Sequence, residues 1–526
     1  MSGKLANAPV RLAELVAALS LGIDLGFGQP MEHVLRQCLI ALRLAERFGL
    51  DERQRSAVYY TALLINVGCH SDAHEQAKWF GDDIATKAMK YHHDARSLRM
   101  ATSAMRWLGS GHAPLHRFRL GLEFLLSGHR EVDGMIAHHA AIARTLGEQL
   151  SLPNEVLEAL GASYERWDGR GWPGQLGGNE IPLVVRIAQP AEYVEVANRM
   201  GGVSAVKKLA REWRGKQFDP SVSDLLVAEA EQLLAGLETI RAWDAVVDAQ
   251  PALTAVLSGE RLDAALLAIA NFVDLKSPYF LGHARAVANL AAEAALRFGM
   301  SDTEVRLLRH AGLVHGFGRL GISNAILDKR GPLGTGERER VRLQPYFTER
   351  MLHQSEAFAP IARIVVQQRE RIDGSGYPRG LTGAAISREA RILAAVDAYQ
   401  AMREPRPHRP ARSAEEAAAT LRLEVKASRY DADAVEAVLG SAGHRVARRR
   451  EGPAGLTLRE VDVLKLLARG LPNKDIGKSL FISPKTVANH VEHIYSKIHA
   501  STRAGASLFA MQHGLLPDED FPSRTA

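Results

Sequence analysis

The sequence predicts an all-α protein of several domains, and three observations lead to this fold class. Ala, Leu, Arg and Glu dominate the composition, and runs of β-branched residues are few, which favours helices over strands. Apolar residues make up 46% of the chain and charged residues 24%, as in ordinary globular proteins. A chain of 526 residues exceeds what one hydrophobic core supports, so roughly three or four domains are expected.

The composition also limits where the protein works. No stretch reaches the roughly 18 uninterrupted apolar residues that a membrane helix requires, and Arg11 and Glu14 interrupt the N-terminal apolar run where a signal peptide would be apolar. Cys38 and Cys69 are the only cysteines, so neither a disulfide framework nor a Cys-based zinc site is expected. The sequence therefore predicts a cytoplasmic protein with no membrane contact.

The first 440 residues contain a diverged internal repeat. Residues 165–187, ERWDGRGWPGQLGGNEIPLVVRI, parallel residues 370–392, ERIDGSGYPRGLTGAAISREARI. The interval from His33 to Ile65 equals that from His283 to His315, at 32 residues each. Equal intervals that carry similar residues predict two copies of one helical domain.

The intervals also set the expected domain boundaries. The first copy carries about 45 extra residues between equivalent landmarks, and an insertion around residues 71–120 accounts for them. We expect the first copy at residues 1–245 and the second copy at residues 255–442. A basic linker at 443–455, which contains Arg448-Arg449-Arg450, then leads to a C-terminal domain at 456–520.

The motifs of the second copy resemble those of a known enzyme family. They read SPYFLGHARAV from Ser277, LLRHAGLVHGFGRLGI from Leu307, ILDKRGPL from Ile326, DGSGYPRGLTG from Asp373 and RILAAVDAYQAM from Arg391. Over about residues 262–439 this pattern resembles the HD-GYP family, all-α phosphohydrolases of the wider HD superfamily. The first copy is a weaker match. The resemblance implies tandem HD-type helical domains, and in that family this region supports cyclic-dinucleotide chemistry.

The resemblance also implies which side chains would hold metal ions. The family uses His and Asp clusters that bind two or three divalent metals and activate a water molecule. Three residues of the second copy stand at such positions: His283, His315 and Asp397. Gly316 replaces the aspartate of the HD pair, and Gln368 and Arg369 replace a pair of histidines. In the first copy Ile65 and Asn66 replace the HD pair.

These replacements lead to an interpretation of both copies as catalytically dead, degenerate HD-type domains. The three surviving side chains are then vestigial ligands, with no metal cofactor, or at most a single divalent metal. We accordingly expect that the protein is not an enzyme. The pocket is instead expected to bind a small anionic ligand, through the positive charge of two arginines and the glycine-rich loop. The candidate residues are Arg319, Arg369, Asp373, Gly376 and Tyr377.

The C-terminal segment predicts a helix-turn-helix unit. Thr457 and Glu460 form a capping-box pattern that begins one helix, and Gly470 ends it. Ser483-Pro484 is an N-cap followed by proline at the first helical position. The helix after it has apolar residues at intervals of four, three and four, which leaves a polar outer face for a DNA groove.

The same segment closely resembles the LuxR-type DNA-binding domain. The matching stretches are TLRE from Thr457, LLARGLPNKDIG from Leu466, SPKTVANHVEHIYSKI from Ser483 and STRA from Ser501. The resemblance implies binding to double-stranded DNA as a homodimer through the last helix, expected from about Thr502 to His513. The expected DNA-binding residues are Lys474, Ser483, Lys485, Thr486, Asn489, His490, His493, Lys497 and Arg503.

Together these features favour a one-component transcription regulator whose HD-type domains sense a ligand or hold a dimer. The alternative is a metal-dependent phosphohydrolase, similar to cyclic-dinucleotide phosphodiesterases, that is fused to a DNA-binding domain. A scaffold without a ligand is a third possibility that sequence does not separate from the first. Metal content and hydrolysis of a cyclic dinucleotide distinguish the first two.

Overall fold

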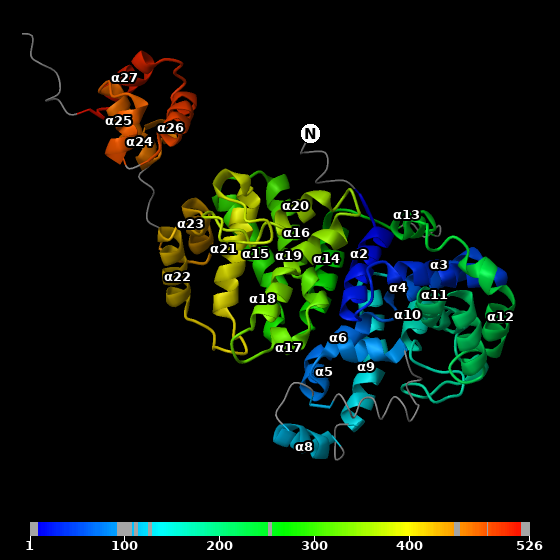
Figure 1. Ribbon diagram of the computed structural model, residues 1–526. Coiled ribbons are helices and arrows are strands. Elements are labelled where there is room, and N and C mark those ends of the chain that lie inside the picture. Colours follow the sequence, from blue (N-terminus) through cyan, green and yellow to red (C-terminus); the bar gives the residue numbers. More distant parts are fainter. Residues whose placement is uncertain are drawn as a thin grey trace, which may run out of the picture. The chain divides into compact units, whose positions relative to one another are not determined.

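The computed structural model describes residues 9–91, 108–109, 114–124, 129–250, 255–445, 453–480 and 482–516. They fall in two compact units, residues 1–445 and 446–526, and Figure 1 shows that both are helical. The predicted all-α class is confirmed, since the described strands are the two-residue pair β1 (Val10–Arg11) and β2 (Val256–Leu257). Among the described helices, none is long and apolar enough to cross a membrane.

The first copy of the repeat is a bundle in which α11 packs against α3, α4 and α12. Its main helices are α2 (Leu12–Gly26), α3 (His33–Arg47), α4 (Glu52–Leu64), α9 (His129–Gln149), α10 (Asn154–Gly161), α11 (Leu183–Trp213), α12 (Pro220–Leu234) and α13 (Ala242–Asp248). Shorter elements are η1 (Val67–His70), α5 (Ala73–Phe80), α6 (Asp83–Ala88), η2 (Met89–Tyr91), α8 (Pro114–Glu123) and η4 (Gly178–Glu180). The insertion expected around 71–120 covers α5, α6, η2 and part of α8, and its residues 92–107 and 110–113 lie outside the described ranges.

The second copy is a bundle centred on α15, which packs against α16, α21 and α23. Its helices are α14 (Gly259–Asp274), α15 (His283–Arg297), α16 (Asp302–Val314), α17 (Asn324–Leu327), α18 (Thr335–Arg342), α19 (Gln344–Leu352), α20 (Ala359–Val365), α21 (Arg388–Arg403), α22 (Ala414–Lys426) and α23 (Ala432–Ser441). Three single-turn elements join them: η5 (Pro278–Phe280), η6 (Phe317–Gly321) and η7 (Gly383–Ala385).

Equivalent residues of the two copies make equivalent hydrogen bonds. A carboxylate at the end of the first helix accepts a backbone N–H at the start of the second helix, Asp24 from Val34 and Asp274 from Ala284. These contacts satisfy N–H groups that a helix start leaves free. In the loop of the GYP tripeptide, Glu370 likewise accepts two backbone N–H groups, as Glu165 does in the first copy.

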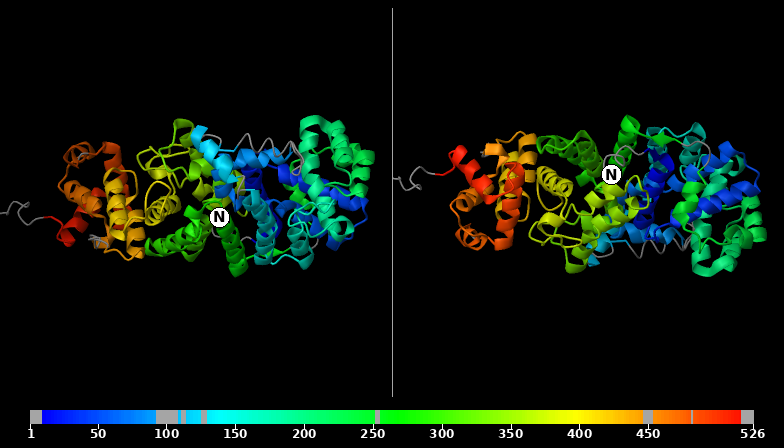
Figure 2. Two further views of the ribbon diagram at one scale, coloured as in Figure 1. Left: turned by 90° about the horizontal axis from the view of Figure 1, so that it is seen from below. Right: turned by 90° about the horizontal axis from the view of Figure 1, so that it is seen from above.

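The two copies share one continuous hydrophobic core. Figures 1 and 2 show α2 between the helices of the first copy and those of the second, and α2 packs against η6 and α19. Gly22 makes this approach possible, because a Cβ at Gly22 would lie 2.7 Å from Leu320 and 2.6 Å from Met351. Strands β1 and β2 pair antiparallel across the two copies. The copies therefore fold as one unit, and the domain limits at 245 and 255 stay predictions.

The second unit is a small helical domain with its own core. It contains η8 (Pro453–Gly455), α24 (Leu458–Ala468), α25 (Asn473–Leu480), α26 (Pro484–Lys497) and α27 (Arg503–Gln512). Thr457 and Glu460 form the expected capping box of α24, and the Ser483 hydroxyl accepts the Thr486 N–H at the start of α26. Most of the basic linker, residues 446–452, and residues 517–520 lie outside the described ranges.

Candidate functional site

The side chains expected at the HD-type site of the second copy converge in one buried cluster, called the second-copy pocket below. His283 opens α15, His315 follows α16 and Asp397 lies in the middle of α21. One ligand atom from each lies within 4.8 Å of the other two, and all three residues are buried. The start of α15, the end of α16 and the middle of α21 therefore bring together two imidazoles and one carboxylate that are far apart in sequence.

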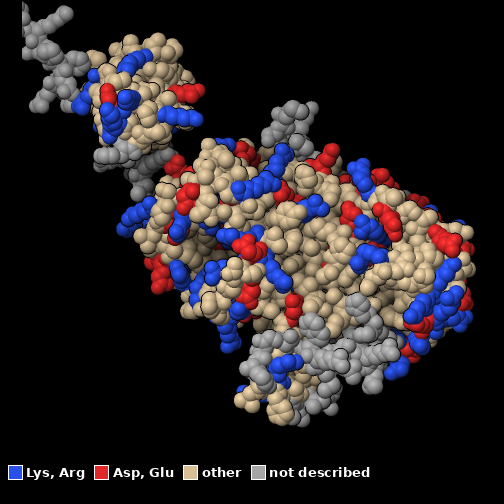
Figure 3. All heavy atoms as spheres, in the orientation of Figure 1, with Lys and Arg blue, Asp and Glu red and all other residues tan. Residues whose placement is uncertain are grey.

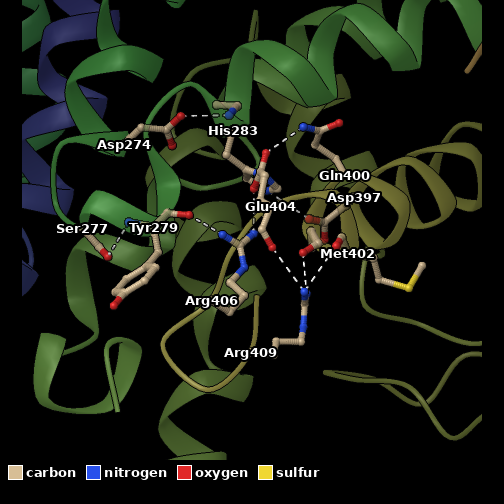
Figure 4. A network of polar contacts seen from close by, with 12 residues as sticks. Asp274, Ser277, Tyr279, His283, Asp397, Gln400, Met402, Glu404, Arg406 and Arg409 are labelled. Atoms are coloured by element: carbon tan, nitrogen blue, oxygen red, sulfur yellow. Dashed lines mark hydrogen bonds and ion pairs between the residues drawn. The ribbon is translucent and has the colours of Figure 1, made fainter. Parts of the chain in front are cut away.

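Hydrogen bonds fix how these three groups face one another. Nδ1 of His315 donates to the carbonyl of Gly312 at 2.6 Å, which directs Nε2 into the pocket, 3.8 Å from Oδ1 of Asp397. Nε2 of His283 lies 3.2 Å from the same Oδ1, and its Nδ1 lies 2.8 Å from Glu404. Figure 4 shows His283 beside both carboxylates.

Two guanidinium groups share the pocket with the three candidate ligands. A Cβ on Gly316 would lie 2.8 Å from Nη1 of Arg319, so the Arg319 side chain fills the space that Gly316 leaves. Its Nη2 lies 3.0 Å from Nε2 of His315. Arg369 makes an ion pair with Asp397, at 3.0 Å between Nη2 and Oδ2. Positive charge therefore lies where the family pattern places a carboxylate and a pair of histidines.

An aromatic ring and a third arginine complete the pocket. The guanidinium of Arg319 lies 4.3 Å from the centre of the Phe280 ring, and that of Arg406 lies 4.8 Å from it. Such stacking holds a guanidinium in place while leaving its N–H groups available. Arg406 also pairs with Glu404 at 2.9 Å, as Figure 4 shows. Sequence reasoning missed Phe280, Glu404 and Arg406, because the last two follow α21 in a loop without a recognised motif.

Burial and charge set the protonation of the candidate ligands. Burial, reinforced by the charge of Arg319, lowers the pKa of His315 to about 3, so its imidazole is neutral at physiological pH. Burial alone would raise the pKa of Asp397, yet Arg369 and the two histidines hold it well below the usual value. A neutral imidazole and an ionised carboxylate are the forms that bind a divalent metal.

This donor set fits one divalent ion. Two imidazole nitrogens and a carboxylate are ligands that iron, manganese and zinc accept. A second ion would need a bridging carboxylate, and Gly316 supplies none. Arg319 and Arg369 must also move, because they are hydrogen-bonded to His315 and Asp397. The geometry therefore supports a single metal site that competes with two arginines.

Polar atoms without partners surround the same pocket positions. Within the described ranges, Nε2 of Gln344, Oε1 of Gln368 and Nε of Arg369 are buried without a hydrogen-bond partner. Buried polar groups in folded proteins are nearly always paired. These three atoms are therefore polar groups that remain able to bind a polar molecule or ion.

The candidate residues Asp373, Gly376 and Tyr377 lie in the loop of the Gly376-Tyr377-Pro378 tripeptide, outside the cluster of His283, His315 and Asp397. Asp373 is exposed and accepts the N–H and hydroxyl of Ser375. A Cβ on Gly376 would lie 2.4 Å from the backbone of Glu370 and Arg371, so this glycine lets the loop pack on itself. Tyr377 lies beside Arg342, at 5.6 Å from ring centre to guanidinium. Arg319 and Arg369 are thus the candidate residues that the structure places within the pocket.

In the first copy a lysine fills the equivalent pocket. Nζ of Lys90, from η2 of the insertion, lies 2.6 Å from Glu192 and 2.9 Å from Asn66, and 4.5 Å from the ring centre of Phe27. The Tyr91 hydroxyl also donates to Glu192, at 2.6 Å. Burial opposes the charge of Lys90, but Glu192 raises its pKa above the ordinary value. An ammonium group here does not fit a metal ion, and no repeat landmark signalled Lys90.

The outer face of α26 carries the polar residues expected to contact DNA. Val487 and Ile494 are buried in the domain core, whereas Lys485, Asn489 and His493 are exposed. Thr486 and His490 lie on the same face and are partly exposed. This division leaves the expected recognition surface free of contacts to the core.

A groove beside the start of α26 offers a place for phosphate. It has a volume of about 440 Å³ and is lined by residues of α25 and the turn, including Lys474, Lys478 and Ser483. Basic side chains lie on the visible face of this unit (Figure 3). Lys497 and Arg503 are instead engaged within the domain, Lys497 with Glu460 at 2.7 Å and Arg503 with backbone carbonyls of α24 and the following turn. Their contacts to DNA phosphates stay predictions.

The fold and these sites define a chain with an HD-type helical unit and a helix-turn-helix domain. The "HD domain" family model matches residues 268–434, and the model "Bacterial regulatory proteins, luxR family" matches residues 454–510. The 3′3′-cGAMP-specific phosphodiesterase 3 of Vibrio cholerae is 30% identical over 414 residues, which cover 78% of this chain and 90% of that protein. The chain therefore belongs to the HD-domain family of that phosphodiesterase.

Two further comparisons agree with this assignment. The cyclic di-GMP phosphodiesterase response regulator RpfG of Xanthomonas campestris is 35% identical over 162 residues, 30% of this chain and 42% of that protein. A crystal structure of a cyclic GMP-AMP specific phosphodiesterase of V. cholerae has a TM-score of 0.59 at 24% identity, covering 83% of this chain and 99% of that chain. At this level of identity the likeness shows the fold.

The relationship corrects the expectation that the protein is not an enzyme. A relative that matches most of the chain is a phosphodiesterase, which points toward an enzyme. The expectation of a dead site rested on Gly316, Gln368 and Arg369, which stand where the family has metal ligands. The structure shows that three donors still converge, so the count of replaced positions does not establish a dead site.

Proposed function

We propose that the protein is a DNA-binding transcription regulator whose second HD-type copy binds a cyclic dinucleotide. The observation that carries this proposal is the buried pocket in which Arg319 and Arg369 lie beside His315 and Asp397. Guanidinium groups bind phosphate oxygens through paired, charge-assisted hydrogen bonds. The relatives named above act on cyclic dinucleotides, and such a ligand carries two phosphates and two flat bases.

The aromatic and polar groups of the pocket support the same ligand class. Phe280 packs against the guanidinium groups of Arg319 and Arg406 and so holds both positive charges at the pocket. The unpaired amide atoms of Gln344 and Gln368 match the donors and acceptors of a nucleotide. A ligand that binds better to one arrangement of the copies would shift the protein toward that arrangement and alter DNA binding.

Calorimetric titration of the full chain with 3′3′-cGAMP and cyclic di-GMP tests ligand binding. We expect Arg369→Ala to weaken the affinity at least about tenfold, since a charge-assisted hydrogen bond contributes about 1.5–3 kcal/mol. Arg363→Ala is the matched control, because Arg363 lies on the exposed face of α20. Equal affinities of the two variants, or no heat with either ligand, would reject the proposal.

Metal-dependent hydrolysis of the ligand is the second candidate function. It is favoured by the convergence of His283, His315 and Asp397 and by the phosphodiesterase activity of the relatives. A divalent ion held by these side chains would supply positive charge for a phosphodiester and lower the pKa of a bound water. His315, neutral at physiological pH, and ionised Asp397 would hold it.

Elemental analysis and product detection test this second function separately. We expect manganese or iron to be retained by the wild-type protein and lost in His315→Ala, with His353→Ala as control because His353 is exposed on the surface. Conversion of 3′3′-cGAMP to a linear dinucleotide that disappears in His315→Ala would establish hydrolysis. If the protein binds the ligand but contains no metal and forms no product, the proposed regulator is retained and the proposed hydrolase is rejected.

A further inference from the structure

Three side chains of the first copy form a hydrogen-bonded series that ends at a sulfur atom. Sγ of Cys69 lies 3.3 Å from Nδ1 of His139, and Nε2 of His139 lies 2.8 Å from Oδ2 of Asp72. All three residues are buried. Thiol, imidazole and carboxylate in this order activate a cysteine as a nucleophile, because the base removes the thiol proton and the acid orients the base.

Close packing of two backbones produces this arrangement. A Cβ on Gly68 would lie 2.1 Å from the carbonyl oxygen of His139, so only glycine allows η1 to lie against α9. The approach places Cys69 directly beside the His139 ring. From the other side, the Tyr164 hydroxyl lies 2.8 Å from the same sulfur. In the second copy the position of Cys69 is occupied by Arg319, so the arrangement is specific to the first copy.

The charges around the sulfur favour its ionised form. Burial alone would raise the pKa of Cys69, but His139, Lys90 and the Tyr164 hydroxyl lower it below the ordinary value. Burial opposes the charge on His139, yet Cys69 and Asp72 raise its pKa to about 10. The other charged groups facing this cluster are Lys90 on η2, its partner Glu192 on α11, and Lys87 on α6, which faces Asp72. These charges and hydrogen bonds favour the thiolate of Cys69 beside the imidazolium of His139.

We propose that Cys69 is a nucleophilic modification site that reacts with a hydroperoxide. The thiolate attacks one peroxide oxygen, an S–O bond forms and the O–O bond breaks. Sulfur loses two electrons and the peroxide gains them. The imidazolium of His139 gives its Nδ1 proton to the leaving hydroxide, which produces water, a neutral imidazole and a cysteine sulfenic acid.

The surroundings of Cys69 limit the reagent and the product. Only 6% of the residue surface is exposed, so the site admits a small oxidant such as hydrogen peroxide and excludes a large one. Cys38 is the other cysteine of the sequence, and its thiol is fully buried, with burial raising its pKa. Cys38 donates to the carbonyl of Tyr59 at 3.7 Å, which makes it an unreactive internal reference.

Treatment of the folded full chain with hydrogen peroxide, followed by unfolding in urea that contains dimedone and by peptide mass spectrometry, tests the proposal. We expect sulfenic acid at Cys69 and none at Cys38. The rate of Cys69 oxidation by hydrogen peroxide should rise much less than tenfold per pH unit from pH 6 to pH 8, because His139 and Lys90 lower the pKa of the thiol. A rate that rises about tenfold per pH unit, as for an ordinary thiol, or equal labelling of both cysteines, would overturn it.

A pair of neighbouring histidines on α9 gives a matched comparison. His139→Asn should slow Cys69 oxidation by hydrogen peroxide at pH 6.5 at least about tenfold, since the thiolate loses its counter-ion. His138→Asn should leave the rate unchanged, because His138 is exposed. A folded His139→Asn protein that reacts at the wild-type rate would overturn the proposal. Should that variant not fold, the pH profile of the wild-type protein still decides.

Discussion

At the scale of single residues, Gly316 has the largest effect on the second-copy pocket. Its missing side chain gives Arg319 room to enter, and the Arg319 guanidinium then binds His315 and Asp274. An aspartate at this position would attract a metal ion, whereas with glycine the positive charge comes from the Arg319 guanidinium. The same exchange occurs in the first copy, where Lys90 binds Glu192.

Restoring the carboxylate should therefore restore metal affinity. In the double variant Gly316→Asp with Arg319→Lys, we expect at least about tenfold tighter manganese binding, since one added carboxylate ligand supplies an anionic donor while the bulky guanidinium is removed. Calorimetric titration with Mn²⁺ measures the change. Arg319→Lys alone is the control, and equal affinities of the single and double variants would contradict this account of Gly316.

His70 predicts a pH dependence of stability. Burial, together with the charges of Lys87 and Lys276, lowers the pKa of His70 well below its ordinary value, and both ring nitrogens lack a partner in the described residues. The unfolded chain gains a proton below a pH of about 6.5 that the folded chain does not, so stability falls as the pH falls. The slope from this residue approaches about 1.4 kcal/mol per pH unit below that pH.

Chemical denaturation between pH 7 and pH 5 measures that slope. The variant His70→Leu should lose about 2 kcal/mol less than the wild-type protein between pH 7 and pH 5, with a slope of about 1.4 kcal/mol per pH unit only at the acid end, because leucine takes up no proton. Its stability at pH 7 serves as the reference for any packing change against Gly26, whose Cβ position lies 2.0 Å from the ring. Identical slopes for both proteins would show that His70 is protonated when folded.

At the scale of elements, the segment from α6 to η2 connects the second copy with the pocket of the first copy. Asp83 at its start accepts hydrogen bonds from the Ser323 hydroxyl and the Asn324 N–H of the second copy and pairs with Lys276 at 3.2 Å. Lys90 near its end fills the pocket of the first copy. One short stretch of chain thus contacts both copies.

Loss of the Asp83 carboxylate should destabilise the first unit strongly. Asp83→Ala leaves Lys276 and Lys87 buried without their partner, and breaking a buried ion pair costs about 3–5 kcal/mol. Urea denaturation monitored by circular dichroism measures the loss. Asp224→Ala is the control, since its pair with Arg214 is exposed to solvent and contributes little to stability. Similar losses of unfolding free energy in both variants would contradict a special contribution of Asp83 to stability.

The helix α26 gives a second prediction at this scale. Asn489→Ala should reduce the preference for the operator over random DNA by about 1–3 kcal/mol, because a side chain at a base edge carries sequence information. Lys474→Ala should weaken binding to all sequences and reduce the salt slope by about 1. Fluorescence anisotropy at several salt concentrations separates the two effects. Lys208→Ala, on the surface of α11, should change neither.

At the scale of the whole molecule, we predict that two protomers bind one operator. Leu508 and Met511 on α27 are 55% and 50% exposed, although large apolar side chains on a small domain are usually covered. Leu508→Glu should weaken cooperative binding to a two-fold symmetric site, since a charge would enter the apolar contact. Analytical ultracentrifugation on operator DNA counts the protomers, and one protomer per operator would reject the dimer.

Sequence reasoning reached the helical class, the HD-type pattern and the helix-turn-helix domain because capping residues and repeated motifs are local signals. Thr457, Glu460 and Ser483 form the caps that their spacing indicates. The role of Lys90 was not predictable, since the insertion has no counterpart in the second copy. Neither was the entry of Arg319 into the space at Gly316, because such replacements depend on packing between segments distant in sequence.

The contact between α2 and η6 has a consequence for how the protein is made on the ribosome. Helix α2 is almost entirely buried, but Leu320 and Met351, which pack against Gly22, are synthesised about 300 residues later. At roughly 5–20 residues per second, this apolar helix waits about 15–60 seconds for its partners. The nascent N-terminal half therefore exposes an apolar, aggregation-prone surface during translation. We expect ribosome-associated chaperones to cover this surface until the second copy has been synthesised.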